Sequence, residues 1–349
     1  MNVLIIGAGL IGSSIGLALT KHGDHVYLRD NVSSHALVAA SLGAGSVEAP
    51  PADDVGLVIV AVPPALIGQV VAAALAEFAS AVVTDVASVK SPVLIGLYQT
   101  GGGLERYVGS HPMAGSDRSG PLTARADLFV DCIWVVTPHF ESSPFAIAAV
   151  SHLAEVCGAH IETMTPAEHD IAVAEVSHVP QIISSLMAGN LDGLPSSHLR
   201  LAGQGVRDVT RLAGSEPGMW SQIITANRAA ISDRLRRIVN ALQVLIGQLG
   251  SPPAVAAFLE LGGTGVRALP GKHGRAAADY ARVVVEIPDS PGALGRLFTD
   301  VELVGVNVED LSIEHDRQRA VGYMSMAVEP EKAESLAQAM AARGWSIRD

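Results

Sequence analysis

Gly7-Ala-Gly-Leu-Ile-Gly12, near the start of this chain of 349 residues, is the stretch that decides the fold. It follows a short apolar run, Asn2 to Ile6, that is typical of a strand, and it precedes a helix of small residues from Ser13 to Lys21. The first glycine permits a tight turn, the second lets backbone N–H groups approach a pyrophosphate, and the third lets the helix pack on the strand. The stretch therefore predicts a dinucleotide-binding α/β domain. The residues expected to hold the nucleotide are Gly7, Gly9, Leu10, Ile11 and Gly12.

The end of the second strand predicts which dinucleotide binds. His25 to Arg29 reads as that strand, and Asp30 lies 18 residues beyond Gly12, close to the roughly 20 expected for an acid that binds the adenosine ribose. A carboxylate there repels a 2′-phosphate, so the pattern favours NAD. Two alternatives stay open: Arg29 could pair with the phosphate of NADP, and Asp30 could be only a turn residue.

Further apolar runs predict strands whose carboxyl ends line a ligand crevice. Val55 to Val62 reads as a central strand, which places Val62 and Pro63 beside the nucleotide. Ala81 to Thr84 reads as the next strand, and Ser88 follows its carboxyl end. The Ser88 hydroxyl is a candidate site group because it both donates and accepts hydrogen bonds; the alternative is a helix N-cap.

Three later elements complete the first domain. Ile133 to Thr137 predicts a strand, Pro144 to Cys157 a helix and His160 to Thr163 another strand. Alternating strands and helices predict a doubly wound parallel sheet, the Rossmann class of α/β fold, over residues 1–165.

A loop dense in Gly, Ser and Pro carries one imidazole. It reads Val108-Gly-Ser-His-Pro-Met-Ala-Gly-Ser-Asp-Arg-Ser-Gly120, with His111 directly before Pro112. Proline restricts the backbone of the residue before it, which fixes the direction of the His111 side chain. A lone loop histidine is more often structural than catalytic, so His111 is a candidate only in combination with other residues.

Residues 166–250 change to a pattern of long apolar helices. A helical domain this apolar commonly completes its core with a second copy, which predicts a homodimer. Arg207 and Arg211 lie four residues apart, so on a helix they share one face and suit a substrate with carboxylates. The alternative is a solvated surface pair.

The carboxyl-terminal part predicts a linker and a third domain. Residues 251–279 are rich in Gly, Pro and Ala and have little sustained periodicity, so we expect a linker. Residues 280–349 read as strand, helix, strand, strand, helix and strand, a ferredoxin-like unit. Asp289-Ser-Pro-Gly292 opens its first helix and offers backbone N–H groups to a small ligand's carboxylate; the alternative is a tight turn.

Charge and composition argue against several classes of protein. The formal net charge is −12 and Lys and Arg do not cluster, so we expect no nucleic-acid partner. Cys132 and Cys157 form no C-x-x-C site, which suits a reducing cytoplasm. Prolines interrupt the uncharged run Val55 to Ala76, so we expect no membrane span. The close group Glu168-His-Asp170 reads as the polar turn of a helix, and we expect no metal site.

In combination these motifs resemble those of the prephenate/arogenate dehydrogenase family over nearly the first 250 residues. Residues 280–349 resemble an ACT domain, an amino-acid-sensing module. The family motifs occur in the same order. They are Gly7-x-Gly-x-x-Gly12 with Asp30, Thr84-Asp-Val-Ala-Ser-Val-Lys90, Gly109-Ser-His-Pro-Met-Ala-Gly115, Ser177-His-Val-Pro180, and Arg207-Asp-Val-Thr-Arg211 followed by Met219-Trp220.

The resemblance implies an NAD-dependent prephenate dehydrogenase of tyrosine biosynthesis. Such an enzyme moves a hydride from the ring carbinol carbon to NAD⁺ while the ring carboxylate leaves as CO₂. Prephenate then gives 4-hydroxyphenylpyruvate. Two alternatives are an arogenate dehydrogenase, which forms tyrosine from arogenate, and a dual cyclohexadienyl dehydrogenase, which accepts both substrates.

The resemblance also implies roles for individual residues. His111 corresponds to the catalytic histidine that accepts the ring hydroxyl proton. Ser88 holds the same hydroxyl and, as a cofactor-binding residue, orients His111 or the nicotinamide. Arg211 clamps a substrate carboxylate, with Arg207 beside it. Asp117 lies where the family has an acid near the pocket mouth.

Three further residues follow from the same resemblance. Trp220 covers the substrate, and His178 belongs to the Ser-His-x-Pro motif, although a packed core histidine is an equally good interpretation. Family members continue this motif with a second histidine, where this chain has Gln181. The choice between a keto and an amino side chain on the substrate therefore stays open.

The ACT resemblance implies an effector site for tyrosine in the tail. The expected contacts are Asp289, Ser290, Gly292, Ala293, Leu294 and Asn307. Two other functions compete with the main one. A β-hydroxyacid or 6-phosphogluconate-type dehydrogenase would need a catalytic lysine in the helical domain, and none lies between Pro166 and Gly250. The second is a non-enzymatic regulator that binds NAD and an amino acid.

Overall fold

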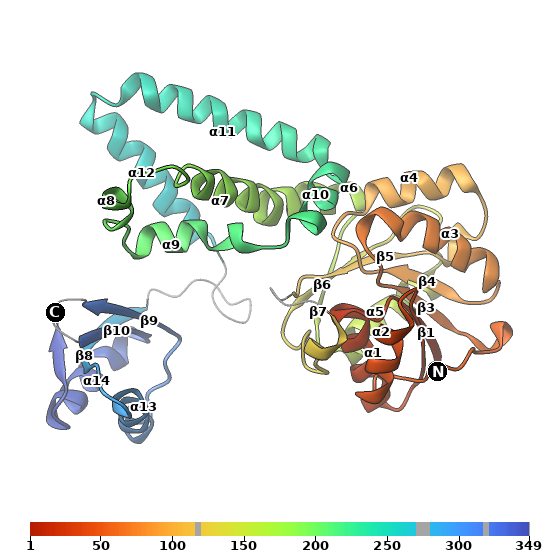
Figure 1. Ribbon diagram of the computed structural model, residues 1–349, viewed down its shortest axis with the longest axis horizontal. Coiled ribbons are helices and arrows are strands. Elements are labelled where there is room, and N and C mark those ends of the chain that lie inside the picture. The colour runs from red at the N-terminus through yellow and green to blue at the C-terminus, as the bar shows by residue number, and fades with distance from the viewer. Residues whose placement is uncertain (116–119, 270–279, 317–320, 349) are drawn as a thin grey trace. The chain divides into compact units, whose positions relative to one another are not determined.

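The computed structural model describes residues 1–115, 120–269, 280–316 and 321–348. Two compact units make up the chain, Met1–Leu242 and Gln243–Asp349, and each is described by itself. Figure 1 shows the α/β sheet and the helices that follow it in the first unit, and a separate antiparallel sheet in the second.

Four parallel strands form the first sheet, in the order β2-β1-β3-β4. The apolar runs of β1, β3 and β4 are buried, as parallel strands covered by helices require, whereas the edge strand β2 alternates buried with more exposed residues. The strands are β1 (Asn2–Ile6), β2 (His25–Arg29), β3 (Leu57–Val60) and β4 (Val82–Asp85).

Helices cover both faces of this sheet, as the alternating pattern predicted. One apolar core packs α1, α2 and α5 on one face, and a second core packs α3 and α4 on the other. The helices are α1 (Leu10–His22), α2 (Ser33–Ser41), α3 (Ile67–Glu77), α4 (Ser91–Thr100) and α5 (Pro144–Val156). Short 3-10 turns are η1 (Ala52–Asp54), η2 (Pro64–Leu66), η3 (Leu104–Arg106) and η4 (Pro121–Thr123).

Three more strands correct the prediction of a wholly parallel sheet. They are β5 (Gly109–Pro112), β6 (Ile133–Thr137) and β7 (His160–Thr163), in the order β5-β6-β7. β5 pairs antiparallel with β6, and a parallel bridge between Val83 and Tyr107 joins it to β4. The described part of the β5–β6 connection contains no α-helix, and an antiparallel return needs none.

His111 therefore lies on a strand and not in the loop that the sequence suggested. It is paired with Val135 of β6, and Pro112 next to it is paired with Trp134. Glycine, serine and proline content pointed to a loop, but pairing with the apolar strand β6 outweighs that local preference.

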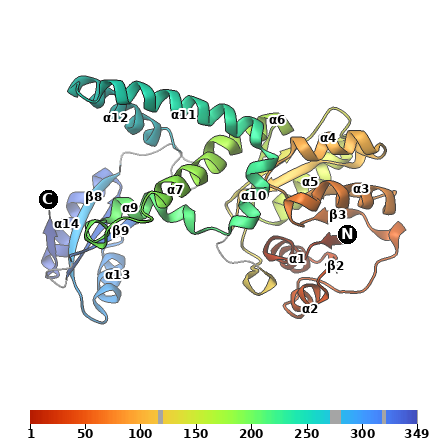
Figure 2. The same ribbon diagram turned by 45° about the horizontal axis from the view of Figure 1, so that its top comes forward.

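Helices dominate the rest of the first unit (Figure 2). α6 (Pro166–Val173), the π-helical turn η5 (Ala174–His178) and α7 (Val179–Gly189) are continuous. They are followed by α8 (Ser196–Leu199), α9 (Gln204–Thr210), η6 (Arg211–Gly214) and α10 (Pro217–Ala226). α11 (Arg228–Gln248) runs across the boundary between the units.

The continuous stretch Pro166–Gly189 is long and apolar enough to cross a membrane by length and composition alone. A core helix of a soluble protein passes the same test. This one buries His169, Asp170 and His178, which hydrogen-bond to the neighbouring elements described below, so we interpret it as a core helix.

Helix α12 (Pro252–Arg267) corrects the prediction of a linker over residues 251–279. Its glycines each cost about 1 kcal/mol relative to alanine, which weakened the helical signal in the sequence. The two prolines fall in the first turn, where a missing N–H costs no helical hydrogen bond. Residues 270–279 of the expected linker lie outside the described residues.

The second unit contains the expected strand-helix-strand-strand-helix-strand order. Its antiparallel sheet has the order β11-β8-β10-β9, and α13 and α14 contribute Leu297, Leu336 and Met340 to its core. The elements are β8 (Ala281–Pro288), α13 (Ala293–Val304), β9 (Asp310–Asp316), β10 (Val321–Val328), α14 (Pro330–Ala342) and β11 (Ser346–Arg348).

Candidate active site

The glycine turn between β1 and α1 has the shape that a pyrophosphate needs. Gly7 has a φ of +106°, and a Cβ there would lie 2.3 Å from the carbonyl oxygen of Ala61. A Cβ at Gly12 would lie 1.9 Å from the carbonyl oxygen of Gly7, whereas nothing lies within 4 Å of one at Gly9. The turn is thus tightly packed at Gly7 and Gly12 and open at Gly9, which precedes the first residue of a 13-residue helix. These residues fit a dinucleotide.

Asp30 closes this turn from the end of β2. Its carboxylate accepts hydrogen bonds from the backbone N–H of Ala8 at 2.7 Å and of Val32 at 2.8 Å. The turn-residue alternative is therefore realised, but a carboxylate has about four acceptor positions and two remain for ribose hydroxyls. Arg29 is held by two hydrogen bonds to Glu77, at 2.8 and 2.9 Å.

Val62 and Pro63 follow β3 directly beside the glycine turn, since Ala61 contacts Gly7 there. Just beyond them, the side-chain oxygen of Gln222 on α10 accepts a hydrogen bond from Ala65 N at 3.1 Å. The helical region is thereby attached at the carboxyl end of β3, where the crevice was predicted.

A chain of three side chains begins at His111. His111 Nδ1 lies 2.9 Å from His169 Nε2, and His169 Nδ1 lies 2.9 Å from Asp170 Oδ1. His169 is fully buried and Asp170 nearly so, while part of His111 remains accessible. Glu168-His-Asp170 is thus not a solvated polar turn: two of its members extend from His111 into the protein.

Asp170 also joins the helical region to the nucleotide-binding region. Its carboxylate accepts hydrogen bonds from the backbone N–H groups of Lys90 and Ser91, both at 2.8 Å. These are free amides of the first turn of α4, where a negative charge is stabilised. Burial raises the pKa of Asp170, but hydrogen bonds from His169, Lys90 and Ser91 outweigh it, and the net pKa is lowered.

A buried ion pair lies beneath the His111 strand. Lys90 Nζ donates to Asp85 and, at 2.7 Å, to the carbonyl oxygen of Ser110, the residue before His111. Tyr107 donates its hydroxyl to the other carboxylate oxygen of Asp85 at 2.7 Å. Lys90 is only 1% exposed, so it serves this cluster and not a ligand.

The surroundings keep His111 neutral. Burial first, and then the nearby His169, Lys90 and His178, hold the pKa of His111 well below 6.5. A neutral imidazole is what a general base needs near pH 7. Nε2 of His111 has no hydrogen-bond partner among the described residues, so it is the ring nitrogen left for a ligand.

His178 joins this group because the helix that carries it is not regular. His178 lies nine positions after His169, and on a regular α-helix that spacing turns the two side chains to opposite faces. The π-helical turn Ala174–His178 widens the helix and reduces the offset to roughly a right angle. Burial lowers the pKa of His178 to about 4. Its Nδ1 lies 3.1 Å from the amide nitrogen of Asn227, and its ring contacts Trp220 edge to face, with centroids 6.1 Å apart.

Ser88 lies in the segment between Asp85 and Lys90, whose two ends both bond to Ser110. α4 begins at Ser91 with no side-chain cap, so Ser88 is not its N-cap. Ser88 is partly exposed, and its hydroxyl has no partner among the described residues. It is therefore available to a ligand near the carboxyl end of β4.

Gln181 tethers the segment that carries the predicted substrate-binding arginine. Its amide nitrogen donates to the carbonyl oxygen of Leu212 at 2.8 Å. Arg211, next to Leu212, is the first residue of η6, because α9 ends at Thr210. Arg207 and Arg211 are both exposed, and neither has an ion pair within the described parts of the chain.

Asp117 lies outside the described residues. Three residues that the site brings together were not singled out from the sequence as site residues: His169, Asp170 and Asn227. The signal for the first two was the Glu168-His-Asp170 group, whose burial the local sequence does not reveal. Among the described residues, no group of three or more His, Cys, Asp or Glu side chains has the geometry of a metal site.

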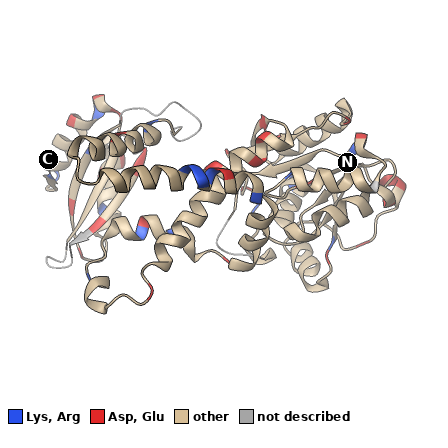
Figure 3. Cartoon of the chain, turned by 90° about the horizontal axis from the view of Figure 1, so that it is seen from above, with Lys and Arg blue, Asp and Glu red and all other residues tan. Residues whose placement is uncertain are grey.

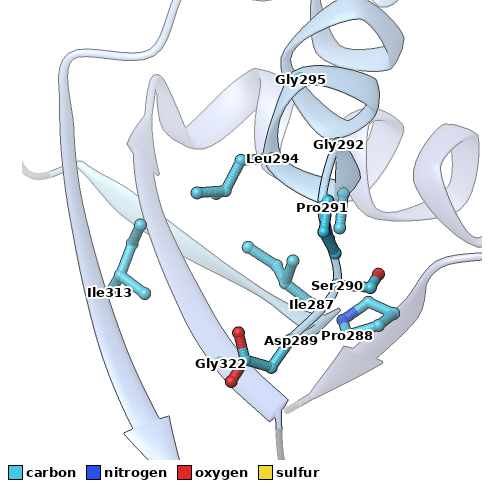
Figure 4. A pocket seen from close by; sticks show the side chains of 11 residues that line it. Ile287, Pro288, Asp289, Ser290, Pro291, Gly292, Leu294, Gly295, Ile313 and Gly322 are labelled. Atoms are coloured by element: carbon cyan, nitrogen blue, oxygen red, sulfur yellow. The ribbon is translucent and has the colours of Figure 1, made fainter.

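The second unit contains a separate pocket of about 370 Å³ (Figure 4). Asp289, Ser290, Gly292, Ala293 and Leu294, all predicted effector contacts, line it. The other lining residues are Ile287, Pro288, Pro291, Gly295, Ile313 and Gly322. Asn307 is not among the lining residues and instead donates to Glu309.

Comparison with known proteins covers both regions of the first unit. Residues 15–163 match the model of the prephenate dehydrogenase nucleotide-binding domain, and residues 165–251 match that of the prephenate dehydrogenase dimerization domain. The probable prephenate dehydrogenase NovF of Streptomyces niveus is 33% identical over 357 residues, covering 99% of this chain and 98% of its own length.

Two solved structures are similar at 26% identity. Arogenate dehydrogenase of Synechocystis has a TM-score of 0.67 and covers 77% of this chain and 100% of its own. Prephenate dehydrogenase of A. aeolicus, in complex with hydroxyphenyl propionate and NAD⁺, has a TM-score of 0.66 and covers 76% of this chain and 97% of its own. With both domain models matched and NovF aligned along nearly the whole chain, the protein belongs to the prephenate dehydrogenase family.

Proposed function

We propose that the protein is an NAD-dependent prephenate dehydrogenase that converts prephenate to 4-hydroxyphenylpyruvate and CO₂. The observation that carries this proposal is the chain from His111 through His169 to Asp170, which leaves one neutral, accessible imidazole nitrogen. Family membership and the open glycine turn support the same reaction.

NAD supplies a hydride acceptor for the ring carbinol carbon when it is bound. His111 takes the hydroxyl proton at Nε2 while the C–O bond becomes a carbonyl. Loss of CO₂ then returns an electron pair to the ring and its oxygen, and the proton goes back from His111 as the phenol forms. Ser88 holds the same oxygen, and Trp220, which contacts His178, excludes water from the ring.

Arg211 binds a carboxylate of the substrate, with Arg207 as a second cation on the preceding helix. Both guanidinium groups are free to do so in the described structure. A planar, bidentate donor suits a carboxylate. Gln181 supports this role because its hydrogen bond fixes the backbone next to Arg211.

NAD is preferred over NADP for two reasons. Asp30 presents a carboxylate where a 2′-phosphate would lie. Arg29, the cation that NADP would need, is already paired with Glu77 and stacks over the Phe78 ring, 5.6 Å from its centroid.

Arogenate is the alternative substrate. Gln181 stands where family members have a second histidine, so the usual cation beside the substrate side chain is absent at this position, which favours an amino side chain. An arogenate dehydrogenase is also among the similar structures.

The second unit is, in this proposal, an ACT domain that binds tyrosine and inhibits the enzyme. Its pocket holds one acid, Asp289, which pairs with the ammonium group, while Leu294 and Ile313 contact the ring. The backbone N–H of Gly292, at the start of α13, receives the carboxylate, whereas that of Ala293 already donates to the carbonyl oxygen of Ser290 at 3.2 Å.

We further propose a homodimer in the cytoplasm. The helical region exposes large apolar side chains, which include Leu186, Val206 and Leu242. Both cysteines are free, and burial raises the pKa of Cys157 to about 12. Figure 3 shows Lys and Arg interspersed with Asp and Glu along the described part of the chain. The proposed domains are residues 1–165, 166–250 and 280–349, with 251–279 between the last two.

The proposal is tested with four pairs of substrate and cofactor, and turnover is followed by the absorbance of the reduced nicotinamide in NADH or NADPH. Prephenate and arogenate are each supplied with NAD⁺ and NADP⁺, and the highest kcat/KM is expected for prephenate with NAD⁺. Faster turnover of arogenate would establish the alternative. No turnover by a protein that binds NAD in a titration would favour a non-enzymatic regulator.

A further inference from the structure

Asp170 and Asn227 together contact both histidines on the helix Pro166–Gly189. The Asp170 carboxylate accepts a hydrogen bond from His169. The backbone carbonyl oxygen of Asp170 lies 2.7 Å from the side-chain amide nitrogen of Asn227. The same nitrogen lies 3.1 Å from Nδ1 of His178. All four residues are at most 5% exposed, so these polar groups depend on one another for hydrogen bonds.

The position of the hydrogen on His111 follows from this geometry. A carboxylate only accepts, so His169 Nδ1 carries its hydrogen. A neutral imidazole has one N–H, and His169 is kept neutral by burial, which lowers its pKa. His169 Nε2 is therefore an acceptor, and His111 Nδ1, 2.9 Å away, must donate to it. The lone pair of His111 is left on Nε2.

The opposite tautomer follows for His178. A backbone carbonyl only accepts, so the Asn227 atom that faces Asp170 O is its amide nitrogen. The second hydrogen of that nitrogen is available to His178 Nδ1. Nδ1 must then be an acceptor, since two donors would otherwise face each other. Neutral His178 therefore carries its hydrogen on Nε2.

We propose that Asp170 and Asn227 are positioning residues that hold His111 and His178 in opposite tautomers. His111 presents an acceptor nitrogen and His178 a donor N–H to the same ligand. This pair recognises a molecule with a hydroxyl group and a second oxygen that accepts. The hydroxyl proton moves to His111 Nε2, whereas His178 only donates a hydrogen bond and keeps its proton. The identity of that ligand rests on the proposed function.

Nitrogen NMR of the full-length protein tests the tautomers directly. Histidines are labelled with ¹⁵N, and long-range ¹H–¹⁵N correlations distinguish a protonated ring nitrogen from one with a lone pair. The signals are assigned by their loss in His111→Asn and His178→Gln. We expect N–H at Nδ1 of His111 and at Nε2 of His178. The proposal would be overturned if both rings had the same tautomer, or if His111 carried its hydrogen on Nε2 and His178 on Nδ1. This test needs no variant at residue 170 or 227.

A substitution at residue 227 tests the cause. Asn227→Asp replaces the donor by an acceptor, so the ring hydrogen of His178 is expected to move to Nδ1. The new carboxylate should also raise the pKa of His178, which adds a step to the pH profile of the kinetics. Asn190→Asp makes the same change at an exposed position and should leave both the spectrum and the profile unchanged. An unchanged His178 tautomer in a folded Asn227→Asp protein contradicts the role of Asn227.

His169 provides a second, independent pair of variants. His169→Gln keeps an acceptor oxygen for His111 Nδ1 and should retain the tautomer and most of kcat. His169→Leu removes it, and kcat should fall on the order of 10²–10⁴-fold, the range that a general base contributes. Equal kcat in the two variants would show that the tautomer of His111 does not affect turnover. The spectra are independent of turnover, so a protein with these tautomers and no activity on prephenate would refute the function and leave this inference standing.

Discussion

At the scale of single residues, the site consists of side chains whose roles are set by their neighbours. Burial above all keeps His111 neutral, its Nδ1 lies against Nε2 of His169, and His169 in turn bonds to Asp170. The sequence predicted His111, Ser88 and Arg211 because each lies in a recognisable motif. It did not predict His169 or Asn227, because burial depends on how distant elements pack and not on the residues next to them.

Replacing His111 tests the general base. His111→Asn retains a side-chain N–H toward His169, so the protein should fold and bind NAD with unchanged affinity. Its kcat should fall on the order of 10²–10⁴-fold because nothing accepts the hydroxyl proton. Steady-state kinetics measures the loss, and quenching of tryptophan fluorescence measures NAD affinity. Near-normal turnover would remove His111 from the mechanism.

Replacing Arg211 tests the substrate carboxylate contact. Arg211→Ala should raise KM for prephenate, at a cost of about 2 kcal/mol or more once the pair is desolvated, with a smaller effect on kcat. Arg211→Lys keeps the charge but not the bidentate geometry, so its KM should be intermediate. Arg267→Ala, at the end of α12, is the control for loss of a surface charge. A KM unchanged in Arg211→Ala would assign the carboxylate to another group.

At the scale of elements, the sequence predicted regular features best. The strands β1, β2, β3, β4, β6 and β7 were found close to where apolar runs indicated them, whereas β5 lies in a stretch that was expected to be a loop. The reversal between β5 and β6 was missed, because strand direction depends on the path of the chain between strands. The π-helical turn Ala174–His178 was also missed, because it depends on tertiary contacts that place His178 inside the site.

The helix Pro166–Gly189 predicts acid sensitivity. Its two buried histidines, His169 and His178, are neutral in the fold, and both pKa values are lowered. The unfolded chain binds these protons near pH 6.5, so it holds more protons than the native state between pH 6.5 and about 4. Stability is therefore fully present above pH 6.5 and is lost as the pH falls toward 4.

Thermal melts of the wild type and His178→Gln between pH 7.5 and 4.5 measure this contribution. Glutamine does not titrate, so the Tm of the variant should fall less steeply below pH 6.5 than that of the wild type. Buried carboxylates such as Asp170 contribute equally to both proteins and cancel in the comparison. Parallel curves would show that His178 is not neutral in the native state.

At the scale of the whole molecule, the order of domains was predictable but not every boundary. Helix α12 occupies much of the expected linker, since its glycines hid a helix that is stable in the chain. The tail was predicted more closely, because period-2 strands such as Val321–Val328 alternate buried and partly exposed residues without interruption.

The tail predicts feedback by tyrosine. Removing residues 280–349 should abolish inhibition by tyrosine and leave turnover of prephenate unchanged, since the proposed active site lies in the first unit. Asp289→Asn in the full chain should weaken tyrosine binding by removing the partner of its ammonium group. Calorimetric titration with tyrosine measures this. Inhibition that persists in both proteins would place the effector at the active site.

The Asp170 carboxylate accepts two hydrogen bonds from backbone N–H groups at the start of α4, and these bonds also tie the helical region to the sheet. Separating the two regions at residue 170 requires both bonds to break, at about 1.5–3 kcal/mol for each bond to a charged group. We therefore expect residue 170 to stay against the start of α4 when a nucleotide binds at Gly9, and the bond between His169 and His111 next to it to be preserved.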